Sequence, residues 1–334
     1  MKASRKFNVT QALIVILMVA LVLAGCGNNA GSSNGEGNNQ GNNAGASGNE
    51  AQNAEYKVKH AMGETTIKGT PKRVVVLTNE GTEALLAMGV KPVGAVKSWT
   101  GNPWYEHLKA DMEGVEVLGD ESQPNLEKIA ELAPDLIIGT KFRQEKIYSQ
   151  LEAIAPTVMS ETLRGEWQNN FKLYAEALNK KAEGDKVIAE FDANVKAFKE
   201  KAGDKLNTKV SIVRFMPGKV RIYYKNTFSG MILSELGMAR PAAQDKDEFS
   251  DDVSKERIPD MEGDILIYFT YEEGDNKATD LEKEWMQDPL WKNLNVVKNN
   301  KVFKVDDTTW NTSGGVISAN KVIEELYGFL DIQK

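Results

Sequence analysis

The chain has 334 residues, a formal net charge of −7 and a single cysteine, Cys26. The acidic balance argues against nucleic acid as a partner, and one cysteine excludes an intramolecular disulfide. The residues after the first fifty suffice for one large domain or for two domains of modest size.

The first 25 residues predict a secretory signal. Lys2, Arg5 and Lys6 precede an apolar run over 9–24, which is shorter than the roughly 20 residues that a membrane-spanning helix needs. The order Leu-Ala-Gly-Cys at 23–26 resembles a bacterial lipobox. That resemblance implies cleavage before Cys26 and a lipid on its thiol, which would anchor the protein in the cell membrane, facing the extracytoplasmic side. A plain signal anchor with an incidental cysteine is the alternative.

Residues 26–54 predict a flexible linker. The segment consists mainly of Gly, Asn, Ser, Ala and Gln, and Glu36 and Glu50 are its only charges before the end of this range. Such a composition cannot bury enough apolar surface to fold. Without the three basic residues of the signal, the net charge changes from −7 to −10.

The first part of the remaining chain predicts a parallel sheet. Short apolar runs indicate strands at 73–77, 92–96, 115–118 and 135–139, with helical patterns at 82–88, 125–132 and 144–154. Continuous Val, Ile and Leu strands that alternate with helices are typical of a parallel sheet covered on both faces.

The middle of the chain predicts a long helical connection. Helical spacing extends over 167–178 and 182–201, and no strand pattern interrupts it. A helix of about 20 residues is about 30 Å long, so it could brace two lobes.

Alternation of strands and helices resumes after this connection. Strands are expected at 209–216, 220–224, 264–269 and 302–305, and helices at 229–236, 254–261, 280–294 and 316–330. The sequence therefore predicts an α/β fold of two similar lobes with mostly parallel central sheets, joined by one long helix. The expected parts are a signal peptide at 1–25, a lipidated linker at 26–54, an N-terminal lobe at 55–168, the connecting helix at 169–203 and a C-terminal lobe at 204–334.

Two segments repeat one pattern. Glu127 precedes the strand-opening Asp135 by eight residues, and Glu256 precedes Asp264 by the same spacing. Either this is coincidence, or two similar lobes each carry one Glu at the same place.

The search for catalytic or metal-binding motifs is negative. The chain has two histidines, His60 and His107, and it lacks a Gly-x-Ser-x-Gly elbow, a phosphate-binding loop and a dinucleotide fingerprint. We therefore expect neither an enzyme nor a resident metal or cofactor. The acidic stretch at 245–252 lacks calcium-loop spacing and predicts a solvated surface loop.

Polar and aromatic residues gather near the ends of predicted strands, where α/β folds bind ligands. Each could instead face water or the core. Arg214, inside an apolar strand, needs a partner for its charge. Trp285 and Trp291 lie on an amphipathic pattern and are expected to pack. The candidate ligand-binding residues are Lys97, Trp99, Lys141, Phe142, Arg143, Trp167, Arg214, Phe215, Arg221, Tyr223 and Trp310, with Arg164 as a further cation.

From about residue 71 to 330, the chain resembles the substrate-binding lipoproteins of ABC importers for ferric siderophores and cobalamin. The residues that carry the resemblance lie at 71–77, 81–94 and 125–138, together with Trp310. Val213-Arg214-Phe215 with Arg221-Ile222-Tyr223 resembles the subgroup that binds hydroxamate or citrate-hydroxamate siderophores.

The resemblance implies a ligand in the cleft between two lobes and a small closing motion. It implies that Glu127 and Glu256 dock onto the permease subunits, and that the siderophore coordinates the iron, so that the protein needs no metal ligand. Arg214 and Arg221 would then bond chelate oxygens, while Trp99, Phe142, Tyr223 and Trp310 would pack on its apolar body. We expect a monomer.

Alternatives within binding proteins are a cobalamin or a haem carrier, and catecholate or citrate chelates also stay open. An exported esterase is the alternative from another class.

Overall fold

The computed structural model describes residues 54–163 and 165–333. The predicted signal, Cys26, the linker up to residue 53 and Arg164 lie outside the described residues. All described residues belong to one structural unit, Ala46–Lys334. Within the described part of the chain, no helix is both long and apolar enough to cross a membrane.

The first sheet contains five parallel strands in the order β5-β4-β3-β8-β9. Four of them are the strands that the sequence predicts. The fifth, β9, is a short strand that the sequence analysis missed. The predicted helix at 144–154 is divided into shorter segments. The elements are β3 (Val74–Val76), α2 (Asn79–Ala87), β4 (Gly94–Ala95), β5 (Glu116–Val117), β6 (Gly119–Asp120), β7 (Gln123–Pro124), α3 (Leu126–Glu131), β8 (Leu136–Thr140), α4 (Lys141–Gln144), η1 (Glu145–Ile147), α5 (Tyr148–Glu152) and β9 (Thr157–Ser160).

A hairpin that the sequence analysis missed precedes this sheet. Its strands β1 (Glu55–His60) and β2 (Gly63–Lys68) pair antiparallel. The Thr65 hydroxyl donates to the carbonyl oxygen of Thr157 on β9 at 2.8 Å. The Tyr56 hydroxyl donates to the carbonyl oxygen of Ala177 at 2.8 Å. These bonds attach the hairpin to the edge of the first sheet and to the helix that follows it.

The second sheet has the order β12-β11-β10-β13-β14 and is mixed. β10, β13 and β14 are parallel, but β11 runs antiparallel to β10 because a tight turn at Pro217-Gly218 reverses the chain. Gly218 has a φ of +74°, a conformation that favours glycine. The strands are β10 (Val210–Met216), β11 (Lys219–Tyr223), β12 (Ser250–Val253), β13 (Ile265–Thr270) and β14 (Val302–Lys304). β12 occupies the end of the acidic stretch expected as a loop.

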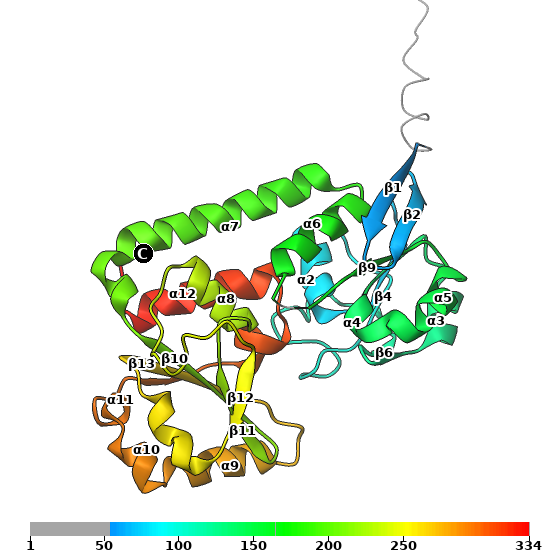
Figure 1. Ribbon diagram of the computed structural model, residues 1–334. Coiled ribbons are helices and arrows are strands. Elements are labelled where there is room, and N and C mark those ends of the chain that lie inside the picture. The colour runs from blue at the N-terminus through cyan, green and yellow to red at the C-terminus, as the bar shows by residue number, and fades with distance from the viewer. Residues whose placement is uncertain (1–53, 164, 334) are drawn as a thin grey trace, which may run out of the picture. The chain divides into compact units, whose positions relative to one another are not determined.

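A single long helix, α7 (Lys181–Ala202), passes both sheets (Figure 1). Its apolar face buries Ile188, Phe191, Val195 and Phe198. We call the part from β1 to β9 the N-terminal lobe and the part from β10 onward the C-terminal lobe; the domain boundaries at 168 and 203 stay predictions. The other helices are α6 (Trp167–Ala177), η2 (Gly203–Asn207), α8 (Phe228–Glu235), η3 (Lys255–Met261), α9 (Lys277–Met286), α10 (Pro289–Asn293), α11 (Asn295–Lys298), the π-helix η4 (Thr308–Thr312) and α12 (Val316–Phe329).

The same capping device starts one helix in each lobe. Thr78 accepts a hydrogen bond from the Gly81 amide at the start of α2, and Thr227 accepts one from the Gly230 amide at the start of α8. A Cβ at Gly81 would lie 2.7 Å from the Thr78 hydroxyl, and one at Gly230 would lie 2.0 Å from the Tyr224 carbonyl oxygen. Both caps therefore require glycine at the third helical position.

The repeated Asp residues also have one role. Asp135 accepts from the backbone amides of Lys72 and Arg73, both at 2.9 Å. Asp264 accepts from the Lys209 amide at 2.7 Å. Each carboxylate thus fixes the start of the central strand of its own sheet, which supports the expectation of two similar lobes.

One continuous hydrophobic cluster joins the lobes through α7 and α12, while a separate cluster lies on the far face of each sheet. Trp285 and Trp291 belong to the outer cluster of the C-terminal lobe, which confirms the prediction that they pack. Because this cluster is continuous, the two lobes share a hydrophobic core and are not joined by a linker alone.

Candidate functional site

One side of the interface between the lobes is closed by a buried carboxylate, Glu83 of α2. It accepts hydrogen bonds from His107 Nε2 at 2.8 Å, from the Ser318 amide and hydroxyl at 3.0 and 2.6 Å, and from the Ser313 hydroxyl. Burial opposes ionisation, yet these bonds outweigh it and hold the pKa of Glu83 below its ordinary value. We call Glu83, His107, Ser313 and Ser318 the interlobe seam.

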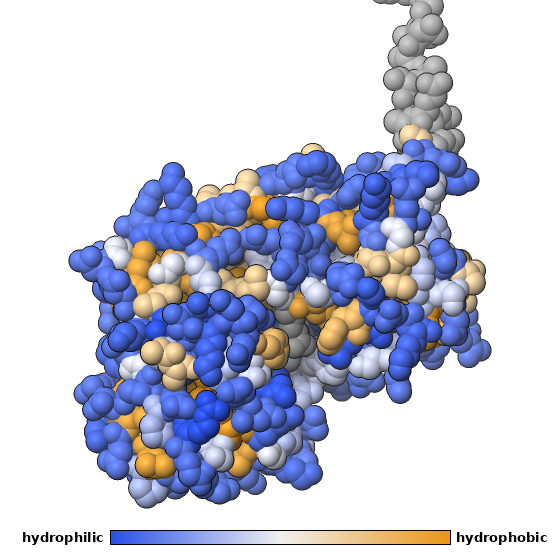
Figure 2. Space-filling view, viewed as in Figure 1, coloured by the Kyte–Doolittle hydropathy of each residue, from blue (hydrophilic) through white to orange (hydrophobic). Residues whose placement is uncertain are grey.

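Elsewhere the interface is open. A cavity of about 400 Å³ is lined from the N-terminal lobe by Phe142 and Arg143, from the segment that follows β9 by Thr162 and Leu163, and from the C-terminal lobe by Phe249. We call it the interlobe cavity. A neighbouring cavity of about 550 Å³ shares Thr162 and Leu163. Apolar side chains interrupt the hydrophilic surface beside the groove between the lobes (Figure 2).

Arg143 is the cation of the N-terminal wall. Its guanidinium carbon lies 4.9 Å from the centroid of the Phe142 ring and 5.6 Å from that of Trp99. Its Nε lies 3.7 Å from a carboxylate oxygen of Glu121, which is buried. Stacking and charge pairing together fix the guanidinium at the cavity wall.

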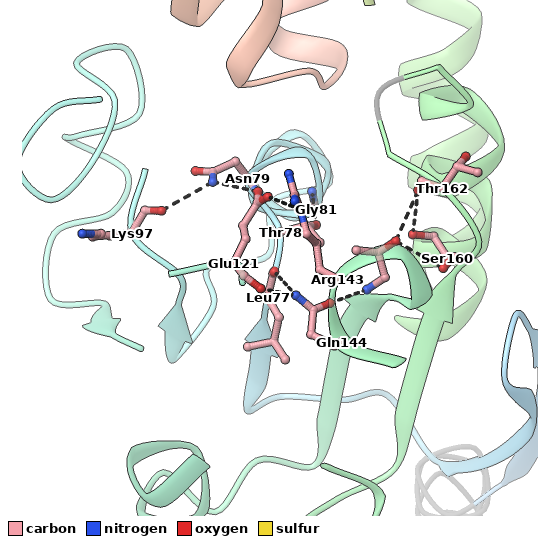
Figure 3. Close-up of polar contacts among 11 residues, drawn as sticks. Leu77, Thr78, Asn79, Gly81, Lys97, Glu121, Arg143, Gln144, Ser160 and Thr162 are labelled. Atoms are coloured by element: carbon pink, nitrogen blue, oxygen red, sulfur yellow. Dashed lines mark hydrogen bonds and ion pairs between the residues drawn. The ribbon is translucent and has the colours of Figure 1, made fainter. Parts of the chain in front are cut away.

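A buried polar network holds Glu121 in place (Figure 3). Its Oε1 accepts from the backbone and side-chain nitrogens of Asn79, at 2.8 and 2.9 Å. Gln144 donates to the carbonyl oxygens of Leu77 and Glu121, at 3.2 and 2.6 Å, and accepts from the Thr140 amide at 2.8 Å. The network thereby ties together the carboxyl ends of β3 and β8, where the cavity begins.

Arg214, near the carboxyl end of β10, is a buried cation of the C-terminal lobe. It donates through Nε and Nη2 to the two carboxylate oxygens of Asp307, at 2.6 and 3.1 Å, and through Nη1 to the Tyr223 hydroxyl at 3.1 Å. With the Asn311 amide oriented so that its oxygen faces the guanidinium, that oxygen accepts from Nη1 and Nη2 at 3.2 Å. These contacts use all five N–H donors of the side chain.

Burial opposes the charge of Arg214, but Tyr223 and Asp307 outweigh it and raise the pKa of the guanidinium above its ordinary value. One face of the guanidinium lies 4.9 Å from the Tyr271 ring centroid. Tyr223 in turn lies 5.9 Å from the ring of Phe249, between centroids. Arg214 therefore does not line the cavity itself, and its link to the wall is Tyr223, whose ring lies near that of Phe249.

The family model for periplasmic binding proteins matches residues 74–309. The chain belongs to the periplasmic binding protein family. It is 50% identical over 324 residues to a Bacillus subtilis protein named "Probable siderophore-binding lipoprotein YfiY", covering 94% of this chain and 95% of that protein. It is 31% identical to the achromobactin-binding periplasmic protein of Dickeya dadantii, covering 77% and 85% of the two chains. The crystal structure of Staphylococcus aureus SirA complexed with staphyloferrin B has a TM-score of 0.77 at 40% identity, covering 83% of this chain and 99% of that one.

The other predicted cations of this binding protein lie nearer the solvent and have carboxylate partners. Lys97 pairs with Asp120 at 3.0 Å, Lys141 with Glu161 at 2.8 Å and Arg221 with Asp252 at 2.5 Å.

Four predicted ligand-binding aromatics are buried in the core, namely Trp167, Phe215, Tyr223 and Trp310. Phe215 packs against Trp285 and Trp291, and Trp167 packs edge-on against Phe191. Trp310 has no exposed surface, and its indole nitrogen donates to Glu325 at 2.7 Å. None of these four side chains is among the residues that line the interlobe cavity or its neighbour.

Sequence reasoning missed several residues around the cavity. Phe249 lies in the acidic stretch that was expected to be only a solvated loop, and its aromatic character was the available signal. Asp307, which follows β14, is the acidic partner that Arg214 needs because Arg214 lies in an apolar strand. Tyr271 and Glu121 carried no pattern of their own. Among the described residues, no group of three His, Cys, Asp or Glu side chains could hold a metal ion.

Proposed function

We propose that this protein captures a ferric siderophore in the interlobe cavity and delivers it to the permease of an ABC importer. The observation that best supports this proposal is a cavity built by both lobes, with aromatic and cationic side chains at strand ends. The two cavities that meet at Thr162 and Leu163 fall within the size range of small-molecule sites.

The relatives support iron chelates as the substrate class. The Bacillus subtilis relative is named as a probable siderophore-binding lipoprotein, the Dickeya dadantii relative as achromobactin-binding, and SirA was solved with staphyloferrin B. The cobalamin and haem alternative is not favoured by any of these names. Membership of a family of binding proteins supports capture without catalysis.

Quenching of tryptophan fluorescence tests the proposal. Purified full-length protein in detergent is titrated with ferric siderophores, with the same siderophores free of iron, and with haem and cobalamin. We expect saturable quenching by at least one ferric siderophore, because Trp99 contacts the cavity wall through Arg143. A response to haem or cobalamin alone would overturn the substrate assignment.

We further propose that Glu127 and Glu256 dock onto the permease. Both are exposed, and each lies in the first turn of a short helix before the equivalent Asp residues described above. A hydrogen bond from Ser254 lowers the pKa of Glu256, which favours its charged form. Exposed carboxylates of this kind steer and orient association.

Transport in proteoliposomes that contain the permease separates docking from capture. Glu127→Ala and Glu256→Ala should keep the affinity for the ferric siderophore and lower uptake about ten-fold or more. Glu113→Ala, another exposed carboxylate of the N-terminal lobe, is the matched control. Unchanged uptake in both variants would remove these residues from docking.

Finally, we propose that a lipid on Cys26 anchors the monomeric protein to the outer face of the cell membrane. Cys26→Ser should release the protein into the soluble extracytoplasmic fraction. Retention of that variant in the membrane fraction would contradict the lipid anchor.

A further inference from the structure

One short segment of the C-terminal lobe reaches from the interlobe cavity to the proposed docking carboxylate. Phe249 lines the cavity, β12 follows it, and Glu256 lies in the first turn of η3, the next helix. We call residues 249–257 the linking segment. Because the segment is short, a change at its cavity end can reach η3 without crossing the core of the lobe.

Backbone hydrogen bonds fix the cavity end of the linking segment. The carbonyl oxygen of Phe249 accepts from the Tyr224 amide at 3.0 Å. β12 then pairs antiparallel with β11, and Asp251 lies opposite Ile222. The backbone of Phe249 is therefore held at the edge of the second sheet, while its side chain lines the cavity.

Side chains connect the middle of the linking segment to η3. The hydroxyl of Tyr224, a fully buried residue, donates to Asp251 Oδ2 at 2.7 Å. The same oxygen accepts from Arg257 Nη1 at 3.0 Å, and Arg257 Nε donates to Asp260 Oδ2 at 2.9 Å. The carboxylate of Asp251 thus bridges a buried tyrosine to the helix that carries Glu256.

Each bond of this bridge has a charged partner. Hydrogen bonds from Tyr224 and Arg257 lower the pKa of Asp251, which keeps its carboxylate ionised. Hydrogen bonds to Asp260 and Asp251 raise the pKa of Arg257. Charge-assisted hydrogen bonds are shorter than neutral ones and about twice as strong. The bridge therefore holds Asp251 and Arg257 in one arrangement.

The far end of η3 is attached to the sheet separately. Gln244 is buried, and its Nε2 donates to the carbonyl oxygen of Asp260 at 3.1 Å. Its Oε1 accepts from the amide of Ile212, on β10, at 3.0 Å. The end of η3 is thus anchored on a central strand, whereas Arg257, in its first turn, is held by Asp251 of the linking segment.

The cavity end of the linking segment is also where a bound chelate would act. The Phe249 ring is 44% exposed, and an occupant of the cavity would cover it. Covering the ring would restrict the motion of the linking segment, and the contiguous hydrogen bonds would extend this restriction to η3. A ligand that orders a segment lowers the entropic cost for a second partner that binds the same segment.

We propose that occupancy of the interlobe cavity is communicated to Glu256 through the linking segment, so that the chelate-bound protein presents a more ordered η3 to the permease than the chelate-free protein does. Tyr224 is the positioning residue of this link, because its hydroxyl holds Asp251 from the core. The inference rests on the proposed function and adds to it how docking depends on the captured chelate.

Hydrogen–deuterium exchange of the full-length protein in detergent tests the link without the permease. The probes are ferrioxamine B, ferric citrate, ferric enterobactin and ferric staphyloferrin B, and the one that quenches tryptophan fluorescence at the lowest concentration is used at saturation. We expect the amides of η3 to exchange about five-fold more slowly with this chelate than without it. Unchanged exchange of η3 would overturn the inference while capture stands. Quenching by none of the four probes would instead overturn the proposed function.

Tyr224→Phe separates the link from capture. It removes the hydroxyl that holds Asp251 and keeps the buried ring, so the variant should still be saturated by the chelate, while the slower exchange of η3 is lost. Tyr268→Phe is the matched control, because Tyr268 belongs to the same hydrophobic cluster but donates its hydroxyl to Glu282 of α9. Equal protection of η3 in the two variants would overturn the role of Tyr224.

Equilibrium binding to the permease in nanodiscs tests the consequence for docking. The natural protein should bind about five-fold more tightly with the chelate than without it, and in Tyr224→Phe this ratio should fall toward one. An unchanged ratio in Tyr224→Phe would overturn the inference. If Glu256→Ala bound the permease as tightly as the natural protein does, the docking proposal itself would fail.

Discussion

The interlobe seam and the interlobe cavity are two parts of the same interface with opposite construction. At the seam, Glu83 is fully buried and four donors from both sides of the interface satisfy it. At the cavity, Phe142 and Phe249 face each other's lobe with large exposed areas. One part of the interface is complete without a ligand, and the other is left to be completed by one.

The difference separates residues that set stability from residues that set affinity. A buried carboxylate whose donors come from both lobes loses much if either side moves. An exposed ring costs folding little when it is removed, because it buries little surface until a ligand arrives. We therefore expect the changes below to lower the free energy of unfolding most at the buried carboxylate and least at the exposed ring.

Glu83→Ala should have the largest effect. It leaves the donors of His107, Ser313 and Ser318 without their acceptor in a buried site, so we expect a loss of about 3–5 kcal/mol in the free energy of unfolding. Urea denaturation followed by circular dichroism measures the loss as a lower midpoint. A change below about 1 kcal/mol would mean that water replaces the carboxylate without cost.

Asp307→Ala should have the next largest effect. It removes the bidentate partner of buried Arg214, but Tyr223, Asn311 and Tyr271 still contact the guanidinium. We therefore expect a loss of about 2–3 kcal/mol in the free energy of unfolding. Asp252→Ala, which removes the exposed partner of Arg221, is the matched control and should cost under about 1 kcal/mol.

Acid should remove part of the Glu83 contribution. Because its pKa is lower in the folded state, the stabilisation is fully present above the ordinary pKa of 4.5 and is lost as the pH falls through the lower folded value. Thermal unfolding from pH 6 to pH 3 should therefore show a steeper loss of stability in the natural protein than in Glu83→Gln. Identical slopes would place the titrating groups elsewhere.

The two helix caps should have equal, moderate effects. Thr78→Ala and Thr227→Ala each remove one side-chain acceptor at a helix start, which costs about 1 kcal/mol. Matched losses in chemical denaturation would support the similarity of the lobes. A loss confined to one variant would show that only one lobe depends on its cap.

Phe142→Ser should have the smallest effect. Its ring is mostly exposed, and we expect the free energy of unfolding to change by less than about 0.5 kcal/mol. Differential scanning calorimetry without ligand measures this directly. A clear fall in the melting temperature would mean that the ring already packs in the ligand-free protein.

The sequence predicted the central strands and the long helix better than the strands at the edges of the sheets. Strands such as β3 and β8 are continuous apolar runs, and α7 has a long helical period, so local patterns identify them. β12 contains two Asp residues, and it becomes a strand because β11 offers it a pairing edge. Information of that kind lies in a distant segment and not in the strand itself.

The candidate site shows the same limit. Residue type identified Arg214 as a charge that needs a partner, and the structure supplies Asp307, 93 residues away. Spacing alone could not distinguish Trp310, which is buried in the core that the lobes share, from Phe249, which lines the cavity. Both are aromatic residues after or near strands, and only their packing separates them.

The β1–β2 hairpin also has a mechanical consequence. Glu55, at the start of β1, pairs with Lys68, where the chain leaves β2 for the rest of the lobe. A pull that enters the described chain at Ala54 therefore loads one end of the antiparallel ladder, so its hydrogen bonds break one after another and not all together. The hairpin can lengthen the chain only after its bonds to β9 and α6 also break and Val58 and Ile67 leave the shared core, so the N-terminal lobe resists a pull on its first strand.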